Sequence, residues 1–130
     1  MFSANSYTAT LAVSDISRAK EFYVGKLACT VIREDDTGVG LTAPGSNAIF
    51  TIYVSGAAGT NQATAMAFHV DDVDAAVAAL QAAGVEMENY DFPGLKTVNG
   101  VAELDPGVKT GWFKDPDGNI LAVGNFTWEN

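Results

Sequence analysis

The chain has 130 residues, and 48% of them are hydrophobic, which is enough to bury the core of one domain of ordinary size. Sixteen acidic residues against seven basic ones give a formal net charge of -9, and this excludes nucleic acid and anionic membranes as natural partners. The single cysteine, Cys29, excludes an intrachain disulfide and favours a reducing compartment, so we expect a cytoplasmic protein.

The first half of the chain predicts one strand, one helix and three further strands. The alternation of side chains over Tyr7–Val13 predicts the first strand. Ser14 or Asp15 can cap the helix that follows, which carries apolar residues at helical spacing and should end near Gly25. Three short strands should follow, at 30–34, 38–43 and 48–54.

The second half begins after residues 55–64, which are small and polar and predict a linker. A strand over 65–70 precedes a helix that Gly84 should end. Further strands are expected near 85–90, 109–114 and 119–125. The sequence Asp115–Gly118 predicts a type I turn between the last two strands. Residues 91–108 carry no clear period, and they favour either a lid or a disordered excursion.

Two stretches of the sequence, Val13–Ala19 and Val70–Ala76, resemble each other at a distance of 57 residues. Each closes a strand with Val, places an Asp before an aliphatic residue and then spaces apolar residues at helical intervals. We therefore interpret the chain as a tandem duplication within a single domain, residues 1–130. Module 1 spans about 5–54 and module 2 about 65–126.

The strand alternation separates two faces of the predicted sheet. One face is bulky and apolar, as packing against helices requires. It comprises Leu11, Val13, Phe50, Ile52, Val54, Met66, Phe68, Val70, Phe113, Leu121 and Val123. The other face is mostly small and contains one lysine, so it predicts a covered, concave surface with aromatic walls from Tyr53, His69 and Trp112. A small-molecule pocket fits this pattern, and so does a second minor core filled by a dimer partner or by residues 91–108.

The sequence resembles the glyoxalase/bleomycin resistance/dioxygenase superfamily, also called the vicinal oxygen chelate family. The resemblance rests on Val13–Asp15 with Ala19 to Tyr23, on Phe68–Val73 with Gly84-Val85, and on Trp112–Asn119, the most specific of the three. It implies an α+β fold in which two βαβββ modules form a half-barrel sheet, with helices outside and a central cavity. It also implies a homodimer.

Metal-using members of this family hold a divalent ion with His, Gln or Glu from four strands. The resemblance places those positions at Thr8, Thr51, Ala65 and Ala122 of this sequence. These side chains are poor metal ligands, and His69 is the only strong donor near the predicted site. We therefore expect no metal and no other cofactor, which disfavours metal-dependent glyoxalase and dioxygenase chemistry.

The predicted function is the binding of a small aromatic or amphipathic molecule, cationic compounds included, in a metal-free cavity, as in drug-sequestering relatives. The expected ligand-binding residues are Thr8, Thr10, Thr51, Tyr53, Ala67, His69, Tyr90, Phe92, Trp112 and Lys114. The first alternative is a glyoxalase- or dioxygenase-type lyase or isomerase, either metal-independent with His69 or Tyr53 as acid or base, or with an atypical metal site. The second is a dimeric scaffold that binds no ligand.

Overall fold

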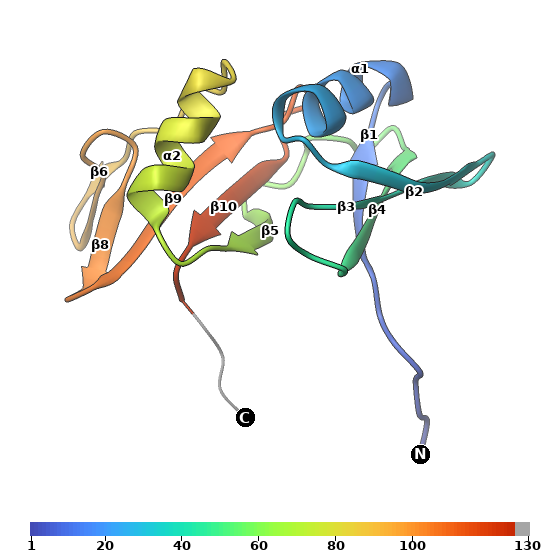
Figure 1. The fold of residues 1–130 in the computed structure, drawn as a ribbon, viewed down its shortest axis with the longest axis horizontal. Helices are drawn as coiled ribbons and strands as arrows, with labels where there is room; N and C mark the ends of the chain where they lie inside the picture. Colours follow the sequence, from blue (N-terminus) through green and yellow to red (C-terminus); the bar gives the residue numbers. More distant parts are fainter. Residues whose placement is uncertain (127–130) are drawn as a thin grey trace. The chain divides into compact units, whose positions relative to one another are not determined.

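The computed structural model describes residues 1–126. The chain divides into two compact units, unit 1 over Met1–Ala58 and unit 2 from Gly59 onward, each with a four-stranded mixed sheet (Figure 1). In each unit a helix packs against the sheet. None of the helices in this part of the chain is long and apolar enough to cross a membrane.

Unit 1 builds its sheet in the order β1-β4-β3-β2. Its elements are β1 (Ala9–Val13), α1 (Ile16–Lys20), the π-helical segment η1 (Glu21–Lys26), β2 (Thr30–Asp35), β3 (Gly38–Thr42) and β4 (Ile49–Val54). β1 and β4 run parallel, and the other neighbours are antiparallel. The first helix therefore continues as η1 and ends at Lys26, next to Gly25, where the sequence predicts its end.

Unit 2 repeats this arrangement with the sheet order β5-β10-β9-β8. Its elements are β5 (Thr64–His69), α2 (Val73–Ala82), β6 (Asp91–Phe92), β7 (Leu95–Lys96), β8 (Ala102–Asp105), β9 (Val108–Lys114) and β10 (Ile120–Gly124). β5 and β10 run parallel, and β6 and β7 form a separate small hairpin. The expectation of an α+β fold with two βαβββ modules is confirmed, and both four-stranded sheets are open.

The duplicated motif has a direct physical role at the start of each helix. The Asp15 carboxylate accepts a hydrogen bond from the Arg18 backbone N–H at 3.0 Å, and the Asp72 carboxylate accepts one from the Ala75 N–H at 3.0 Å. Each Asp is an N-cap that satisfies an amide which the helix itself leaves unpaired. Because the two caps are 57 residues apart, the repeat reflects the same strand-to-helix junction made twice.

The core of each unit lies between its helix and its sheet. In unit 1 it is centred on Tyr23, whose ring lies 5.6 Å from that of Phe50, and on the fully buried Leu41 and Ile52. In unit 2 Phe113 and Leu121 have at most 1% of their surface exposed, and Val73 and Val77 of α2 are also buried. The predicted apolar face is thus the helix-facing side of each sheet.

Three expectations about the apolar face and the elements differ from the structure. Val54 was expected in the core but is 63% exposed at the last position of β4, although its register partner Val13 is buried. The predicted strand near 85–90 is reduced to a single bridge between Met87 and Phe113. Residues 91–108 are not irregular, since they contain the β6–β7 hairpin and β8.

The turn between β9 and β10 is the tight hairpin that the sequence predicts. The Gly118 N–H donates to the Asp115 carbonyl at 3.0 Å, which closes the turn. The buried Asp115 carboxylate accepts hydrogen bonds from the backbone N–H groups of Asp117 at 3.0 Å and Asn119 at 2.9 Å, and from the Asn119 side-chain amide at 2.8 Å. This carboxylate therefore holds the turn together from inside.

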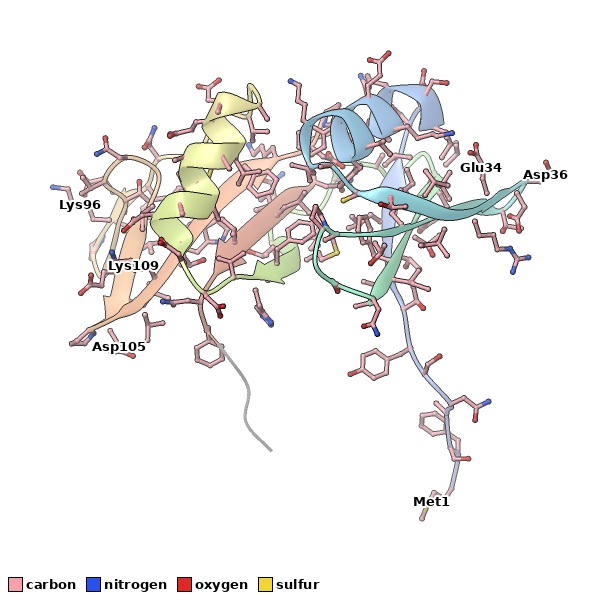
Figure 2. All side chains as sticks on the ribbon, viewed as in Figure 1. Met1, Glu34, Asp36, Lys96, Asp105 and Lys109 are labelled. Carbon is pink, nitrogen blue, oxygen red and sulfur yellow. The ribbon has the colours of Figure 1, made fainter. Side chains whose placement is uncertain are left out.

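Charged side chains lie at the outer ends of the hairpins. Glu34 and Asp36 mark the end of the β2–β3 hairpin, while Asp105 and Lys109 flank the β8–β9 turn (Figure 2). Met1 lies at the end of an exposed N-terminal segment. Charged side chains are mostly exposed in proteins, and these hairpin ends lie in solvent.

Candidate functional site

Three aromatic side chains gather beside the open face of the unit 2 sheet, the face opposite the one that packs against the helix. The Trp112 ring lies 5.4 Å from the Tyr90 ring in an edge-on arrangement, and the Tyr90 ring stacks on Phe92 at 5.8 Å. Trp112 and Tyr90 are half-buried, while Phe92 is 58% exposed. We call Trp112, Tyr90 and Phe92 the aromatic cluster. Aromatic pairs at these distances attract each other by about 0.5–1.5 kcal/mol beyond the area that they bury.

Hydrogen bonds to β9 and within the hairpin place Tyr90 beside Trp112. The Glu88 N–H donates to the Trp112 carbonyl at 2.8 Å, so the segment before Tyr90 runs along the edge of β9. The Tyr90 N–H then donates to the Thr97 hydroxyl at 2.8 Å, and the Thr97 N–H donates to the Tyr90 carbonyl at 2.9 Å. Residues on both sides of the β6–β7 hairpin are thereby tied together next to the indole.

The neighbours of Trp112 on its own sheet are small. Trp112 pairs with Ala122 of β10, which in turn pairs with Ala67 of β5, so these three residues share one row and one face. Phe113 is buried on the opposite face. Both alanines end at Cβ and add little side chain to this row; Ala67 is exposed, whereas Ala122 beside the indole is only 7% exposed.

One ion pair, between Lys114 and Glu88, lies next to the aromatic cluster. The Lys114 ammonium lies 3.2 Å from the Glu88 carboxylate, directly beside the cluster in sequence and register. Partial burial raises the pKa of the Tyr90 phenol above its ordinary value, and the negative charge of Glu88 raises it further against the opposing effect of Lys114. Tyr90 therefore keeps its proton at physiological pH and offers an O–H donor next to the rings.

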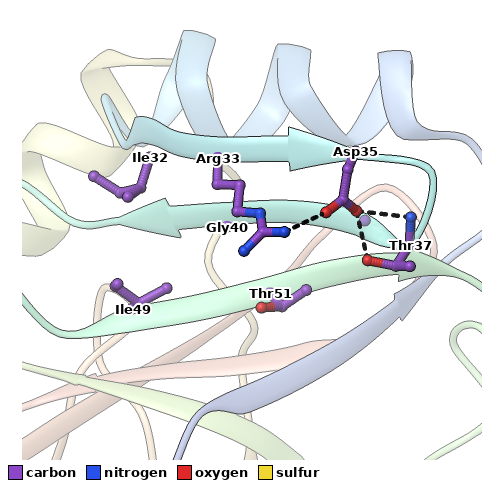
Figure 3. Close-up of a pocket in the computed structure, with 8 residues that line it drawn as sticks. Ile32, Arg33, Asp35, Thr37, Gly40, Ile49 and Thr51 are labelled. Carbon is purple, nitrogen blue, oxygen red and sulfur yellow. Dashed lines mark hydrogen bonds and ion pairs between the residues drawn. The ribbon is translucent and has the colours of Figure 1, made fainter.

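Unit 1 carries a pocket of about 320 Å³ on the open face of its own sheet (Figure 3). Its lining residues come from β2, β3, β4 and the β2–β3 turn. They are Ile32, Arg33, Asp35, Thr37, Gly38, Gly40, Ile49 and Thr51. We call this the sheet-1 pocket. Two isoleucines lie toward one end and the charged residues toward the other (Figure 3).

A short chain of polar contacts fixes the charged end of the sheet-1 pocket. Asp35 Oδ1 accepts from the Thr37 N–H at 2.8 Å and from the Thr37 hydroxyl, while Asp35 Oδ2 lies 3.1 Å from Arg33 Nη2 (Figure 3). The hydrogen bonds from Thr37, with the nearby guanidinium of Arg33, lower the pKa of the Asp35 carboxyl. Asp35 is therefore ionised, and it orients the Arg33 side chain.

The predicted site residues fall into two groups. The structure brings Tyr90, Phe92 and Trp112 together, with Lys114 next to them. Ala67 lies in the row of Trp112, and His69 is exposed one row further along, opposite Gly124.

The remaining predicted residues belong to unit 1. Thr51 lines the sheet-1 pocket, and its register partner on β1 is Thr10. Thr8 is exposed just before β1, and Tyr53 is 38% exposed on β4. Tyr53 and Thr8 are not among the residues that line this pocket.

Sequence reasoning missed most of the sheet-1 pocket. Its lining includes Arg33 and Ile32 of β2, a strand whose register shifts between Val31 and Arg33. Such a bulge reverses the alternation of faces, so parity alone does not assign these side chains. The detectable signal was Gly40, which faces Thr51 across the β3–β4 ladder and leaves space there.

The residues at the family's metal positions do not suit a metal ion. Thr8, Thr51, Ala65 and Ala122 supply at most two hydroxyl groups, whereas zinc and iron sites use His, Cys or carboxylate ligands. Over residues 1–126, no group of three or more His, Cys, Asp or Glu side chains is placed to hold an ion.

A family model described as the glyoxalase/bleomycin resistance protein/dioxygenase superfamily matches residues 6–123. A comparison with curated protein sequences gives no significant match. Among solved structures, a bleomycin-binding protein complexed with bleomycin aligns at a TM-score of 0.70 and 17% identity, covering 95% of this chain and 100% of the other.

Two further structures share the fold. An antibiotic-binding protein from a Streptomyces species aligns at a TM-score of 0.63 and 21% identity, over 94% of this chain and 97% of the other. A fosfomycin resistance protein from Listeria monocytogenes aligns at 0.65 and 21% identity, over 98% and 96%. With its two βαβββ modules and a family match across nearly its whole length, the chain belongs to the glyoxalase/bleomycin resistance protein/dioxygenase superfamily.

Proposed function

We propose that this protein binds a small aromatic or amphipathic molecule without a metal, and that the aromatic cluster of unit 2 is the contact surface. The observation that carries the proposal is the group of three contacting rings, with Trp112 edge-on to Tyr90 and Tyr90 stacked on Phe92, which are left partly exposed. Exposed aromatic rings next to small residues favour a planar ligand, which can stack on the indole and displace water.

The charge of the chain favours cationic members of this ligand class. A net charge of -9 raises the local concentration of cations, and the face of an indole attracts a cation by about 0.5–2 kcal/mol. Glu88 adds a carboxylate beside the rings, although Lys114 partly neutralises it. Sequestration of a drug-like molecule is the biological role that we infer, in line with the bleomycin-binding and antibiotic-binding proteins of the same fold.

Calorimetric titration with two probes of similar shape tests the proposal. Proflavine is planar and cationic, and acridine is its uncharged analogue at mildly alkaline pH. We expect proflavine to bind more tightly than acridine, and the Trp112→Leu variant to bind both at least about tenfold more weakly. The matched control is Phe2→Leu, which removes another exposed aromatic ring, and it should leave binding unchanged.

Two results would count against this function. Equal affinity of wild type and Trp112→Leu would remove the aromatic cluster from the binding surface. The absence of heat with proflavine, acridine and bleomycin alike would argue against binding of planar or cationic drugs altogether.

We further propose a homodimer, which the family resemblance implies, located in the cytoplasm, which the single cysteine favours. The mass in solution, measured by light scattering on a sizing column, tests the dimer. A mass equal to that of one 13.6 kDa chain at micromolar concentration would contradict it.

A further inference from the structure

Strand register places Glu88 and Lys114 on the same face of the unit 2 sheet as the indole. Met87 and Phe113 form an antiparallel bridge, and the Glu88 N–H donates to the Trp112 carbonyl at 2.8 Å, so Glu88 lies opposite Trp112. Lys114 is two residues from Trp112 on β9, and its side chain therefore projects from the same face. Glu88 has the indole as its cross-strand neighbour and Lys114 as its diagonal neighbour.

The Glu88 carboxylate is paired with a lysine of the same unit. The Lys114 ammonium lies 3.2 Å from it, and 50% of the Lys114 side chain is exposed against 28% of the Glu88 side chain. An ion pair with this exposure is weak, because water solvates both groups and the lysine side chain loses conformational freedom when it is held in one position. An ammonium group of another molecule can therefore replace that of Lys114 with little loss.

Both charges act on the aromatic cluster. Burial raises the pKa of the Tyr90 phenol, the Glu88 carboxylate raises this pKa further, and the Lys114 ammonium lowers it. The Tyr90 ring lies 5.4 Å from the Trp112 ring. A ligand that stacks on the indole thus meets a carboxylate and an ammonium beside the rings, and the second opposes the attraction that the first exerts on a cation.

We infer that Lys114 occupies the cation position of the aromatic cluster, and that the ammonium group of a planar ligand displaces it from Glu88. Glu88 is then the specificity-determining residue, and Lys114 is an internal competitor that weakens the binding of cations. The inference rests on the proposed function, since it needs a ligand on the aromatic cluster. It names the ligand class as a planar ring with a short aminoalkyl arm, because residues opposite each other have Cβ atoms only about 4.5–5.5 Å apart.

Two probes with the same ring separate charge from shape. 1-Naphthylmethylamine carries an ammonium group at neutral pH, and 1-naphthalenemethanol carries a hydroxyl group in its place. In calorimetric titration of the wild type, we expect the amine to bind at most about threefold more tightly than the alcohol, because its ammonium only exchanges for that of Lys114. Lys114→Met keeps a long side chain without the charge, and should tighten amine binding about tenfold while the alcohol changes by less than about threefold.

Removal of the carboxylate should abolish this gain. In Glu88→Gln the amine should bind no more tightly than the alcohol. In the double variant with Glu88→Gln and Lys114→Met, loss of the lysine frees no carboxylate, so amine binding should exceed that of Glu88→Gln by no more than about threefold.

Lys109→Met is the matched control for the loss of a lysine. Lys109 lies on the same strand, β9, and forms an ion pair at 2.9 Å with Asp74 of α2, on the side of the sheet that the helix covers. This variant changes the net charge by the same amount as Lys114→Met, and should leave the affinities for both probes unchanged.

The possible outcomes separate the inference from the proposed function. If both probes bind the wild type and Trp112→Leu weakens them, the function stands. The inference is then overturned if Lys114→Met binds the amine no better than the wild type, if it improves the alcohol equally, or if the gain persists in the double variant. Binding of neither probe to the wild type or to Lys114→Met would overturn both.

Discussion

Replacement of Asp115 by alanine should destabilise unit 2 more than any other single change on its surface turns. The carboxylate accepts three hydrogen bonds, from the N–H groups of Asp117 and Asn119 and from the Asn119 side-chain amide, at 2.8 to 3.0 Å. Asp115 is 5% exposed and Asn119 is 7% exposed. Water therefore cannot easily replace the lost acceptor.

The expected size follows from these contacts. A hydrogen bond to a charged group contributes about 1.5–3 kcal/mol, and a buried donor left without a partner costs about 1–3 kcal/mol. Because neighbouring contributions are not additive, we expect Asp115→Ala to lower the free energy of unfolding by about 3–5 kcal/mol. Asp115→Asn keeps one oxygen acceptor and should lower it by about half as much.

Urea unfolding followed by tryptophan fluorescence provides the assay. In a Trp128→Phe background the emission comes from Trp112, which lies in the same unit as Asp115. The matched control is Asp36→Ala, which removes the same charge at the outer end of the β2–β3 hairpin (Figure 2) and should change stability by less than about 0.5 kcal/mol. A loss below about 1 kcal/mol for Asp115→Ala would refute the structural role of this carboxylate.

Three further predictions concern a glycine, a tyrosine and the cysteine. Gly59→Ala should lower the free energy of unfolding by about 2 kcal/mol or more, because the added Cβ would lie 1.8 Å from the Asp117 carbonyl oxygen. Gly94→Ala, at a similar positive φ but in open space, should lower it by about 1 kcal/mol. Equal urea midpoints for the two variants would contradict this. Because the pKa of the Tyr90 phenol is raised in the folded state, its stabilising contribution is present below about pH 10 and is lost as pH rises through the folded-state pKa. Tyr90→Phe should therefore flatten the alkaline fall in the urea midpoint. An unchanged pH profile in this variant would contradict the prediction. Burial raises the pKa of the Cys29 thiol to about 11. A thiol reagent should therefore react slowly with the native protein and rapidly with the protein in denaturant. Rapid labelling of the native protein would be evidence against this burial.

Local sequence signals predicted much of the fold because each has a direct physical cause. Asp15, one of the two predicted caps, caps the first helix, and the corresponding Asp72 of the repeat caps the second. The buried Leu11, Ile52 and Phe113 follow the strand alternation. The family resemblance was confirmed by the match over residues 6–123. Capping, alternation and turn chemistry act over a few residues, so they can be recognised without knowledge of the whole structure.

The remaining features depend on contacts that sequence patterns do not encode. β6 and β7 have two residues each, which is too short for any alternation to be seen between 91 and 96. Val54 has the parity of a core residue but is exposed at the end of β4, and parity does not report where burial stops along a strand. The predicted strand over 85–90 does not form, because this segment pairs with β9 only through one isolated bridge at Met87.

The candidate site was partly accessible from the sequence. Alternation placed Trp112 on the face opposite the buried Phe113, and the structure has it there. Its contact with Tyr90 depends on the hydrogen bonds of Thr97 and on the path of the hairpin, which no local signal reports. Alternation also did not identify Arg33 or most of the sheet-1 pocket, because β2 contains a bulge between Val31 and Arg33.

A crystal structure of the protein with bound proflavine tests the central claim most directly. The account predicts a planar ring stacked on the Trp112 indole, with Tyr90 and Phe92 at its border and no metal ion between ligand and protein. A ligand seated without contact to Trp112, or an ion held there by three or more protein side chains, would contradict it.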